Sequence, residues 1–214
     1  MSETALLSLA IVAFSFPLHE YLFYIISFFV LGAGIKYIDD CFDEKVFSKR
    51  NGFVLAPLLG LFWAFIMAQH PAAATILGAI VLAVFFKGKI DNIAFTAGAL
   101  VIIVALFLSG LAHFLWIPLI VIALAGILDE MANDWADKRT VLSKPVRWIF
   151  EYRFIMKLSV LFFAWIGVFP WLFFFAFLVW DIGYALVYEY VKLAIHNRKF
   201  YYHPTPNNLL NDHR

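Results

Sequence analysis

Apolar residues run along this chain in long blocks that are separated by short polar connections. A helix that crosses a bilayer needs about 20 predominantly apolar residues. Several blocks are shorter than this, which suits a compact bundle whose ends are lined by polar protein. The pattern predicts an all-α, polytopic membrane bundle of about eight transmembrane helices. The predicted spans are residues 5–17, 20–37, 53–69, 71–87, 93–112, 114–128, 153–169 and 171–193.

The composition agrees with a membrane location. Of the 214 residues, 64% are hydrophobic and 14% are charged, whereas a soluble domain is roughly half apolar and a quarter charged. The net charge is only +1, and no nucleic-acid partner is expected. The one cysteine, Cys41, cannot form an internal disulfide. We expect a single integral membrane domain over residues 1–214, surrounded by membrane lipids.

The basic residues predict how the chain crosses the membrane. All 16 Lys and Arg fall in every second connection or at the span ends beside it. Such a bias marks the cytoplasmic side. We therefore expect residues 38–52, 88–92 and 129–152 and the C-terminus to face the cytoplasm from the cell (inner) membrane. The N-terminus lies on the same side if residues 5–17 cross, and on the opposite side if they do not.

Two acidic motifs indicate that the chain contains two related halves. IDDCFDEK (residues 38–45) and ANDWADKR (residues 132–139) each close the second of four spans. The aligned pairs are Asp40 with Asp134, Asp43 with Asp137, and Asp39 with Asn133. Four spans per half predict two parallel pseudo-repeats, about 1–91 and 92–214. The two motifs would then face one another at the cytoplasmic mouth.

The spacing of these acids favours a cation site. Residues three or four apart lie on one face of a helix, and clustered carboxylates repel one another unless positive charge lies between them. Carboxylate oxygens suit Mg²⁺, which completes its shell with water and with phosphate oxygens of a substrate. Solvation of ordinary helix ends is the alternative. The candidate metal ligands are Asp39, Asp40, Asp43, Asn133, Asp134 and Asp137.

Basic residues lie near both motifs on the predicted cytoplasmic side. Positive side chains beside an acid-bound metal would bind the remaining oxygens of a diphosphate. Cytoplasmic loops are commonly basic, so ordinary solvated loops are the alternative. The candidate diphosphate-binding residues are Lys49, Arg50, Lys87, Lys89 and Arg139.

Three stretches together resemble the UbiA superfamily of intramembrane prenyltransferases. IDDCFDEKVFSKRN (residues 38–51) resembles the family's first Asp-rich motif, N-D-x-x-D-x-x-x-D, and NDWADKR (residues 133–139) is similar to the second. FFKGKIDN (residues 85–92) is similar to the Lys-containing connection after the fourth span. This chain has Asp39 in place of the first Asn and Phe47 in place of the last Asp. Val141 stands where the second motif would have a further acid, for which Asp129 and Glu130 upstream could substitute. It is also shorter than the family, which usually has nine spans.

The resemblance implies Mg²⁺-dependent transfer of a prenyl group. The catalytic acids would be Asp40, Asp43, Asp134 and Asp137, which would bind Mg²⁺ and the diphosphate of a polyprenyl donor. Loss of the diphosphate would leave positive charge on the prenyl carbon, and aromatic faces stabilise such charge. The aromatic candidates near the mouth are Tyr37, Phe42, Phe86 and Trp135. The acceptor would be a hydrophobic or lipid molecule, and no motif selects it.

Two features of the last span have alternative interpretations. The aromatic-rich WLFFFAFLVW (residues 171–180) either lines a prenyl channel or packs against lipid, and we favour lipid packing. Asp181 lies inside the span, where an ionisable residue is a functional candidate. It would act on an acceptor or carry a proton, or it would bond a neighbouring helix through Tyr184 or a backbone N–H.

Three other functions compete with prenyl transfer. A cation- or proton-coupled transporter would use Asp181, although transporter sites usually lie near the middle of the membrane, whereas the acids here gather at one mouth. A CDP-alcohol phosphotransferase would also use membrane aspartates, but the D-G-x-x-A-R pattern of that family is missing from both motifs. A degenerate relative that only binds a lipid or a protein partner is the third alternative.

Overall fold

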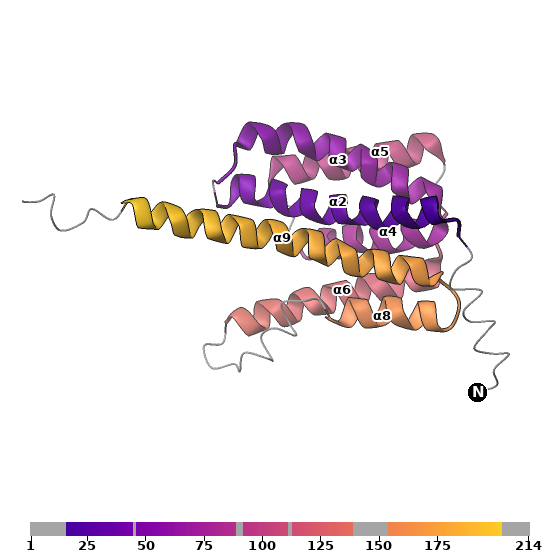
Figure 1. Cartoon of the computed structure of the whole chain (residues 1–214). Helices are drawn as coiled ribbons and strands as arrows, with labels where there is room; N and C mark the ends of the chain where they lie inside the picture. Colours follow the sequence, from indigo (N-terminus) through magenta and orange to yellow (C-terminus); the bar gives the residue numbers. More distant parts are fainter. Residues whose placement is uncertain (1–15, 45, 89–91, 111–112, 139–153, 203–214) are drawn as a thin grey trace, which may run out of the picture.

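The computed structural model describes residues 16–44, 46–88, 92–110, 113–138 and 154–202, and within them it contains seven α-helices and no strand (Figure 1). The helices are α2 (Leu18–Phe42), α3 (Lys49–Gln69), α4 (Pro71–Phe86), α5 (Ile93–Ser109), α6 (Trp116–Asp137), α8 (Phe154–Trp165) and α9 (Trp171–Tyr202). Each falls on one predicted apolar run, and the run at 5–17 lies outside the described residues. The prediction of an all-α fold is confirmed.

Four of the described helices are long and apolar enough to cross a membrane. These are α2, α3, α6 and α9. The helices α4, α5 and α8 have 16, 17 and 12 residues, fewer than the about 20 that a perpendicular crossing needs. The prediction of about eight transmembrane helices is therefore wrong in its number. The described part of the chain is a helical membrane bundle of long and short apolar helices.

Six of the helices form a closed ring. Helix α2 packs against α3 and α9, α4 packs against α3 and α6, and α8 packs against α6 and α9. Helix α5 lies outside the ring, against α3 (Figure 1). In this ring α2 and α6 lie on opposite sides, and their C-terminal ends lie at the same end of the bundle. Both acidic motifs therefore belong to that end.

The contacts of the ring are symmetric. Exchanging α2 with α6, α3 with α8 and α4 with α9 maps each contact in the ring onto another one. Gly32 stands eight residues before Asp40, and Gly126 stands eight residues before Asp134. A side chain on Gly32 would overlap the backbone of α9, and one on Gly126 would press against α4. The two glycines thus occupy equivalent helix crossings, as two related halves would require, and the boundary at residue 91 stays a prediction.

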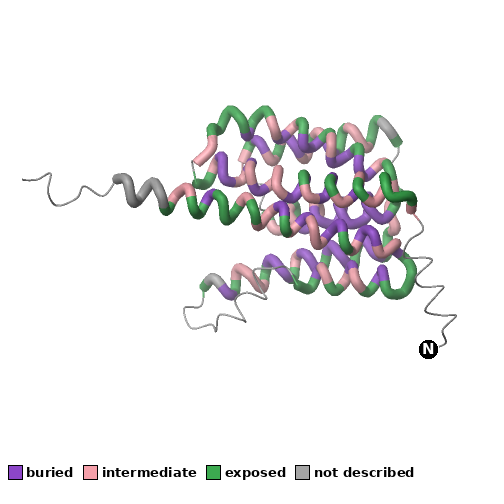
Figure 2. Tube along the Cα trace, viewed as in Figure 1, coloured by how far each residue is buried: buried purple, intermediate pink, exposed green. Residues whose placement is uncertain are grey.

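The core lies inside the ring (Figure 2), and many large apolar side chains are exposed on the outer surfaces of the helices. In α4 every residue from Ala72 to Ile80 is buried. By contrast, α5 exposes Leu100, Ile103 and Phe107. Exposed apolar surface of this extent marks a surface that contacts a membrane or a partner.

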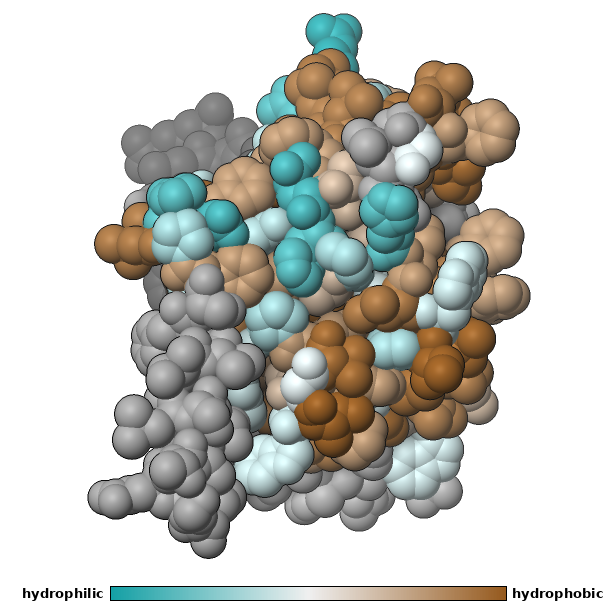
Figure 3. Space-filling model, turned by 90° about the vertical axis from the view of Figure 1, so that its right-hand side faces the viewer, coloured by the Kyte–Doolittle hydropathy of each residue, from teal (hydrophilic) through white to brown (hydrophobic). Residues whose placement is uncertain are grey.

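His70 connects three helices at the end opposite the acidic motifs. It follows α3, and its Nδ1 accepts a hydrogen bond of 3.1 Å from the Ala72 backbone N–H at the start of α4. Its ring centroid lies 4.6 Å from that of Phe173 on α9. Burial lowers the pKa of His70, and the nearby Glu20 carboxylate partly opposes this shift. Figure 3 looks onto this end, where polar surface gathers between apolar side chains.

Candidate functional site

Helices α2 and α6 both end in acids, which reverses the usual preference. The C-terminus of a helix carries partial negative charge, so an acid there is disfavoured by about 0.3–1 kcal/mol. Asp39 and Asp40 lie in the last turn of α2, Asp43 caps it, and Asp134 lies in the last turn of α6. Neither last turn contains a basic residue. A cation beside acids in these positions would offset this cost.

Lys36 supplies part of this positive charge from within α2. Its Nζ lies 2.9 Å from Asp39 Oδ2 and 2.9 Å from Asp40 Oδ1. It also lies 5.6 Å from the ring centroids of Tyr184 and Tyr188 on α9. Asp40 is only 1% exposed, and its Oδ2 has no hydrogen-bond partner among the described residues. Asp40 therefore lies inside the helix packing, as a counter-ion of Lys36.

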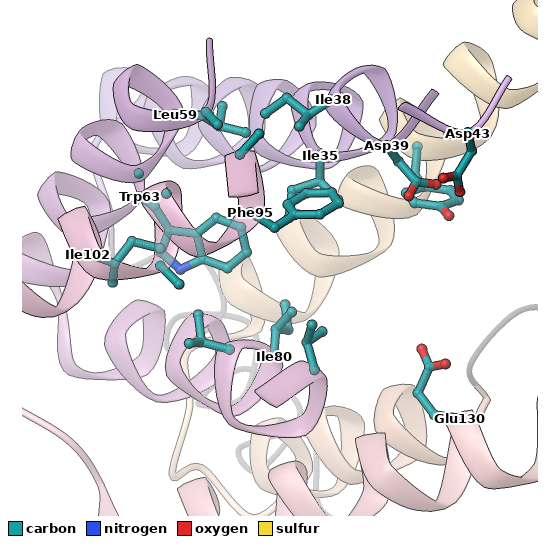
Figure 4. Close-up of a pocket in the computed structure, with 18 residues that line it drawn as sticks. Ile35, Ile38, Asp39, Asp43, Leu59, Trp63, Ile80, Phe95, Ile102 and Glu130 are labelled. Carbon is teal, nitrogen blue, oxygen red and sulfur yellow. The ribbon is translucent and has the colours of Figure 1, made fainter. Parts of the chain in front are cut away.

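Asp39 and Asp43 border a cavity of about 410 Å³ (Figure 4). Glu130 of α6 lies across the mouth from these two aspartates, and Tyr184 of α9 also borders it. The walls are mostly apolar side chains of α2, α3, α4 and α5, including Ile38, Leu59, Ile80, Val84, Phe95 and Ile102. The volume lies in the range of about 300–1,000 Å³ found for ligand pockets. The site is an apolar pocket with carboxylates at its opening.

One polar group lies among the apolar walls. The Trp63 indole borders the cavity (Figure 4) and is 3% exposed. Its ring packs edge to face with Trp180, with the centroids 5.1 Å apart. In the described part of the chain Trp63 Nε1 has no hydrogen-bond partner. A buried donor left in this state costs about 1–3 kcal/mol, so an oxygen of a bound molecule would be favoured there.

The second acidic motif contributes to the site differently from what its alignment predicts. Asp134 Oδ2 lies 2.9 Å from Nζ of Lys87, the residue that follows α4. Neither Asp134 nor Asn133 is among the described residues that line the cavity. The residue opposite the first motif is Glu130, one turn earlier in α6. The side chain of Asp137, the last residue of α6, lies outside what the structure describes.

Asp129, the other upstream acid, holds the start of α8. Its two carboxylate oxygens accept hydrogen bonds from the backbone N–H groups of Ile155, at 2.9 Å, and Met156, at 2.7 Å. These groups lie in the first turn of α8, where the helix itself offers no acceptor. Asp129 is 3% exposed. It therefore links α6 to α8, whereas the neighbouring Glu130 faces the cavity.

The predicted diphosphate-binding residues are described only in part. Lys49 and Arg50 are the first two residues of α3 and are exposed. Neither lines the cavity. Lys87 is engaged by Asp134, as above. Lys89 and Arg139 lie outside the described residues. A role in binding phosphate stays a prediction for all five.

The aromatic residues at the cavity are not the predicted ones. Those that line it are Trp63, Phe95 and Tyr184. The predicted candidates, none of which lines it, are Tyr37, Phe42, Phe86 and Trp135. Sequence reasoning placed aromatic residues by their distance from the motifs along the chain, but α3 and α5 bring theirs in from other parts of the sequence.

The aromatic-rich segment 171–180 has one buried face, while Phe175 on its other face is 52% exposed. Phe173, Phe177 and Trp180 are buried, so the lipid-packing interpretation is wrong for these three residues. The channel interpretation is not supported either, because no residue of 171–180 lines the cavity. The segment instead packs along α2 inside the ring.

Asp181 pairs with the neighbouring helix α8. Lys157 Nζ lies 2.7 Å from Asp181 Oδ2. The interpretation in which Asp181 bonds a neighbouring helix is therefore confirmed, with Lys157 as a partner. Sequence analysis missed this lysine because it treated all basic residues as markers of the cytoplasmic side. Neither residue of the pair lines the cavity.

The acids at the mouth fit Mg²⁺ in one arrangement. Among the described residues, no group of three or more His, Cys, Asp or Glu side chains lies close enough together to hold a metal ion. Mg²⁺ commonly needs only one or two protein carboxylates, because water and substrate phosphate complete its shell. Asp39 and Asp43, four residues apart on α2 and both at the cavity, provide such a pair.

Comparison of the chain with protein-family models, with curated proteins and with solved structures found no match. The likeness of the two acidic motifs to those of the UbiA superfamily therefore stays a resemblance. What the structure defines is a class: a helical membrane protein with an apolar, acid-rimmed cavity at one end of its bundle.

Proposed function

We propose that this protein is a Mg²⁺-dependent intramembrane prenyltransferase, which moves a polyprenyl group from a prenyl diphosphate to a hydrophobic or lipid acceptor. The observation that carries the proposal is the apolar cavity with Asp39 and Asp43 at its mouth. A prenyl diphosphate has an apolar chain and an anionic head. The apolar walls of the cavity would bind its prenyl chain, and a divalent cation at the mouth would bind its diphosphate.

The cation is needed because a diphosphate and carboxylates repel each other. Asp39 and Asp43 would hold Mg²⁺, which would supply Lewis-acid stabilisation of the leaving diphosphate. Asp39 already contacts the Lys36 ammonium, so what supports this assignment is that Asp39 and Asp43 both border the cavity, four residues apart on α2. Glu130, on the other side of the mouth, would face the same ion or the acceptor.

The apolar walls of the cavity would bind the prenyl chain and keep water away from the reacting carbon. Each methylene group of the prenyl chain that is buried contributes about 0.8 kcal/mol. In the transfer, the allylic C–O bond breaks and its electron pair leaves with the diphosphate. The acceptor's nucleophile then bonds to the same carbon and releases its proton to water at the mouth. The rings of Trp63 and Phe95 would stabilise the positive charge in a site from which the walls exclude water.

The proposal is tested by binding of a non-reactive donor. The full chain in nanodiscs is titrated with geranylgeranyl thiolodiphosphate in Mg²⁺ and in EDTA. We expect binding only with Mg²⁺, and at least about tenfold weaker binding for Asp39→Asn and Asp43→Asn, because each substitution removes a metal ligand. Glu189→Gln is the matched control, because Glu189 is a 59% exposed acid of α9 that does not line the cavity.

Equal binding in Mg²⁺ and in EDTA would contradict the proposal, as would equal losses in the mouth variants and the control. Turnover is then followed with labelled geranylgeranyl diphosphate and a membrane lipid extract as the acceptor source. The transporter alternative gains no support, because Asp181, on which it depended, is ion-paired with Lys157.

A further inference from the structure

The central aspartate of each acidic motif is paired with a lysine. Asp40 Oδ1 lies 2.9 Å from Lys36 Nζ, and Asp134 Oδ2 lies 2.9 Å from Lys87 Nζ. Asp40 and Asp134 are aligned positions of the two halves. The lysines are not aligned: Lys36 lies within α2, the same helix as its aspartate, whereas Lys87 follows α4. Lys36 Nζ also lies 2.9 Å from Asp39 Oδ2. Lysines from different elements therefore pair with the two aligned aspartates.

We infer that Asp40 and Asp134 are positioning residues that hold these lysines, and that the mouth takes a single divalent ion, on Asp39 and Asp43. This inference rests on the proposed function and sharpens it. The acidic motifs alone predict that two facing Asp pairs hold metal ions. In the structure, Lys36 contacts both Asp39 and Asp40 and Lys87 contacts Asp134, and of these three aspartates only Asp39 lines the cavity.

Burial separates the roles of the three acids of the first motif. Asp40 is 1% exposed and does not line the cavity, whereas the Asp39 side chain is 31% exposed and lines it together with Asp43. An ion that bound Asp40 would have to displace Lys36, whose Nζ lies over the rings of Tyr184 and Tyr188. Lys36 also contacts Asp39, but only Asp39 offers a carboxylate to the cavity, so burial decides which of the two acids an ion can reach.

The number of ions is measured first on the unaltered protein. The full chain in nanodiscs is titrated with Mn²⁺, alone and with inorganic pyrophosphate, and bound Mn²⁺ is counted by electron paramagnetic resonance. We expect one Mn²⁺ per chain. Two or more per chain would overturn the inference and leave the proposed function standing. No bound Mn²⁺ under either condition would overturn both.

A pair of substitutions then tests the role of Asp40. Lys36→Met combined with Asp40→Leu removes both charges together. Lys36→Met also removes the ammonium beside Asp39, so it should not weaken binding. We expect Mn²⁺ affinity no more than about threefold below that of the unaltered protein, whereas Asp39→Asn weakens it at least about tenfold. Lys157→Met with Asp181→Leu removes another ion pair of low exposure and serves as the matched control. Loss of Mn²⁺ binding in the Lys36 pair, with binding kept in the control, would show that Asp40 is a metal ligand and would overturn the inference.

Folding of each variant is checked by its thermal unfolding midpoint before the titration. If the Lys36 pair does not fold, Lys87→Met with Asp134→Leu makes the same test at a more exposed position, where the side chains are 20% and 41% exposed. Here too we expect Mn²⁺ affinity within about threefold of the unaltered protein, and its loss would overturn the inference.

Discussion

Lys157 on α8 and Asp181 on α9 form an ion pair of 2.7 Å, with side chains that are 14% and 24% exposed. The two helices follow one another along the chain and pack side by side. An ion pair at such low exposure is strong only while both partners remain, because each charge has lost much of its water. This pair therefore links α8 to α9, and the stability of the link depends on charge balance.

Single substitutions of this pair should be more harmful than the double substitution. Lys157→Met or Asp181→Leu alone leaves one poorly solvated charge without its partner and should destabilise the protein by about 3 kcal/mol. The combination should lie within about 1 kcal/mol of the unaltered protein, since apolar replacements of both partners are often nearly neutral. Thermal unfolding in detergent measures all three. Additive losses would mean that the pair is not coupled.

Glycine at the crossing of α2 and α9 should be essential for stability. A Cβ on Gly32 would overlap the backbone carbonyl of Trp180, and one on Gly183 would overlap that of Phe29. Backbone atoms cannot move aside as a side chain can, so Gly32→Ala and Gly183→Ala should each cost about 1–3 kcal/mol. Unfolding midpoints in detergent give the comparison.

Gly34→Ala is the matched control on the same helix. Its Cβ would meet the terminal methyl groups of Leu59, 2.8 and 2.9 Å away, and these belong to a flexible side chain. Alanine also gains about 1 kcal/mol in helix propensity over glycine. We expect Gly34→Ala to cost less than about 1 kcal/mol. Similar losses at all three positions would show that the backbone contacts do not set the effect.

The helices could be predicted from sequence because they follow apolar content, but their lengths could not. Helix α2 continues to Phe42, five residues beyond the predicted end of its span at residue 37. The acids Asp39 and Asp40, which suggested the end of the span, form part of the last turn of α2. Lys36, four residues before Asp40, stabilises this turn through its ion pair with Asp40. This spacing was visible in the sequence, but Lys36 was interpreted only as a marker of the cytoplasmic side.

The candidate site could be predicted at the level of one helix but not between helices. Asp39 and Asp43 lie four apart on α2, and they do share one cavity. The alignment of the two motifs, however, placed Asp134 opposite them, where the structure has Glu130. Which turn of α6 faces α2 depends on how the two helices are set across the ring, and one sequence contains no measure of that arrangement.

His70 should make stability depend on pH. Its pKa is lowered in the folded protein by burial, so the unfolded chain binds a proton at a higher pH than the folded chain does. Stability is therefore complete above the ordinary pKa of about 6.5 and falls as the pH drops below it, by at most about 1.4 kcal/mol per pH unit. Unfolding midpoints between about pH 7.5 and about pH 5 should decline accordingly.

The control for this prediction keeps the helix cap and removes the titration. Asparagine is a favoured N-cap residue, so His70→Asn should still accept a hydrogen bond from Ala72 N–H. We expect the midpoint of this variant to change less over the same pH range. Parallel declines in both proteins would assign the pH dependence to groups other than His70.

Filling the cavity should weaken binding of the prenyl chain of the donor without weakening binding of its diphosphate. Ala99 of α5 lines the apolar wall, whereas Ala97, two residues earlier, does not. Ala99→Phe should displace about two methylene groups of a bound prenyl chain, which corresponds to about 1.6 kcal/mol and about tenfold weaker binding of geranylgeranyl thiolodiphosphate. Pyrophosphate binding with Mn²⁺ should not change, because the mouth acids are on α2. Ala97→Phe should leave both unchanged, and equal weakening by the two substitutions would mean that the chain does not occupy this cavity.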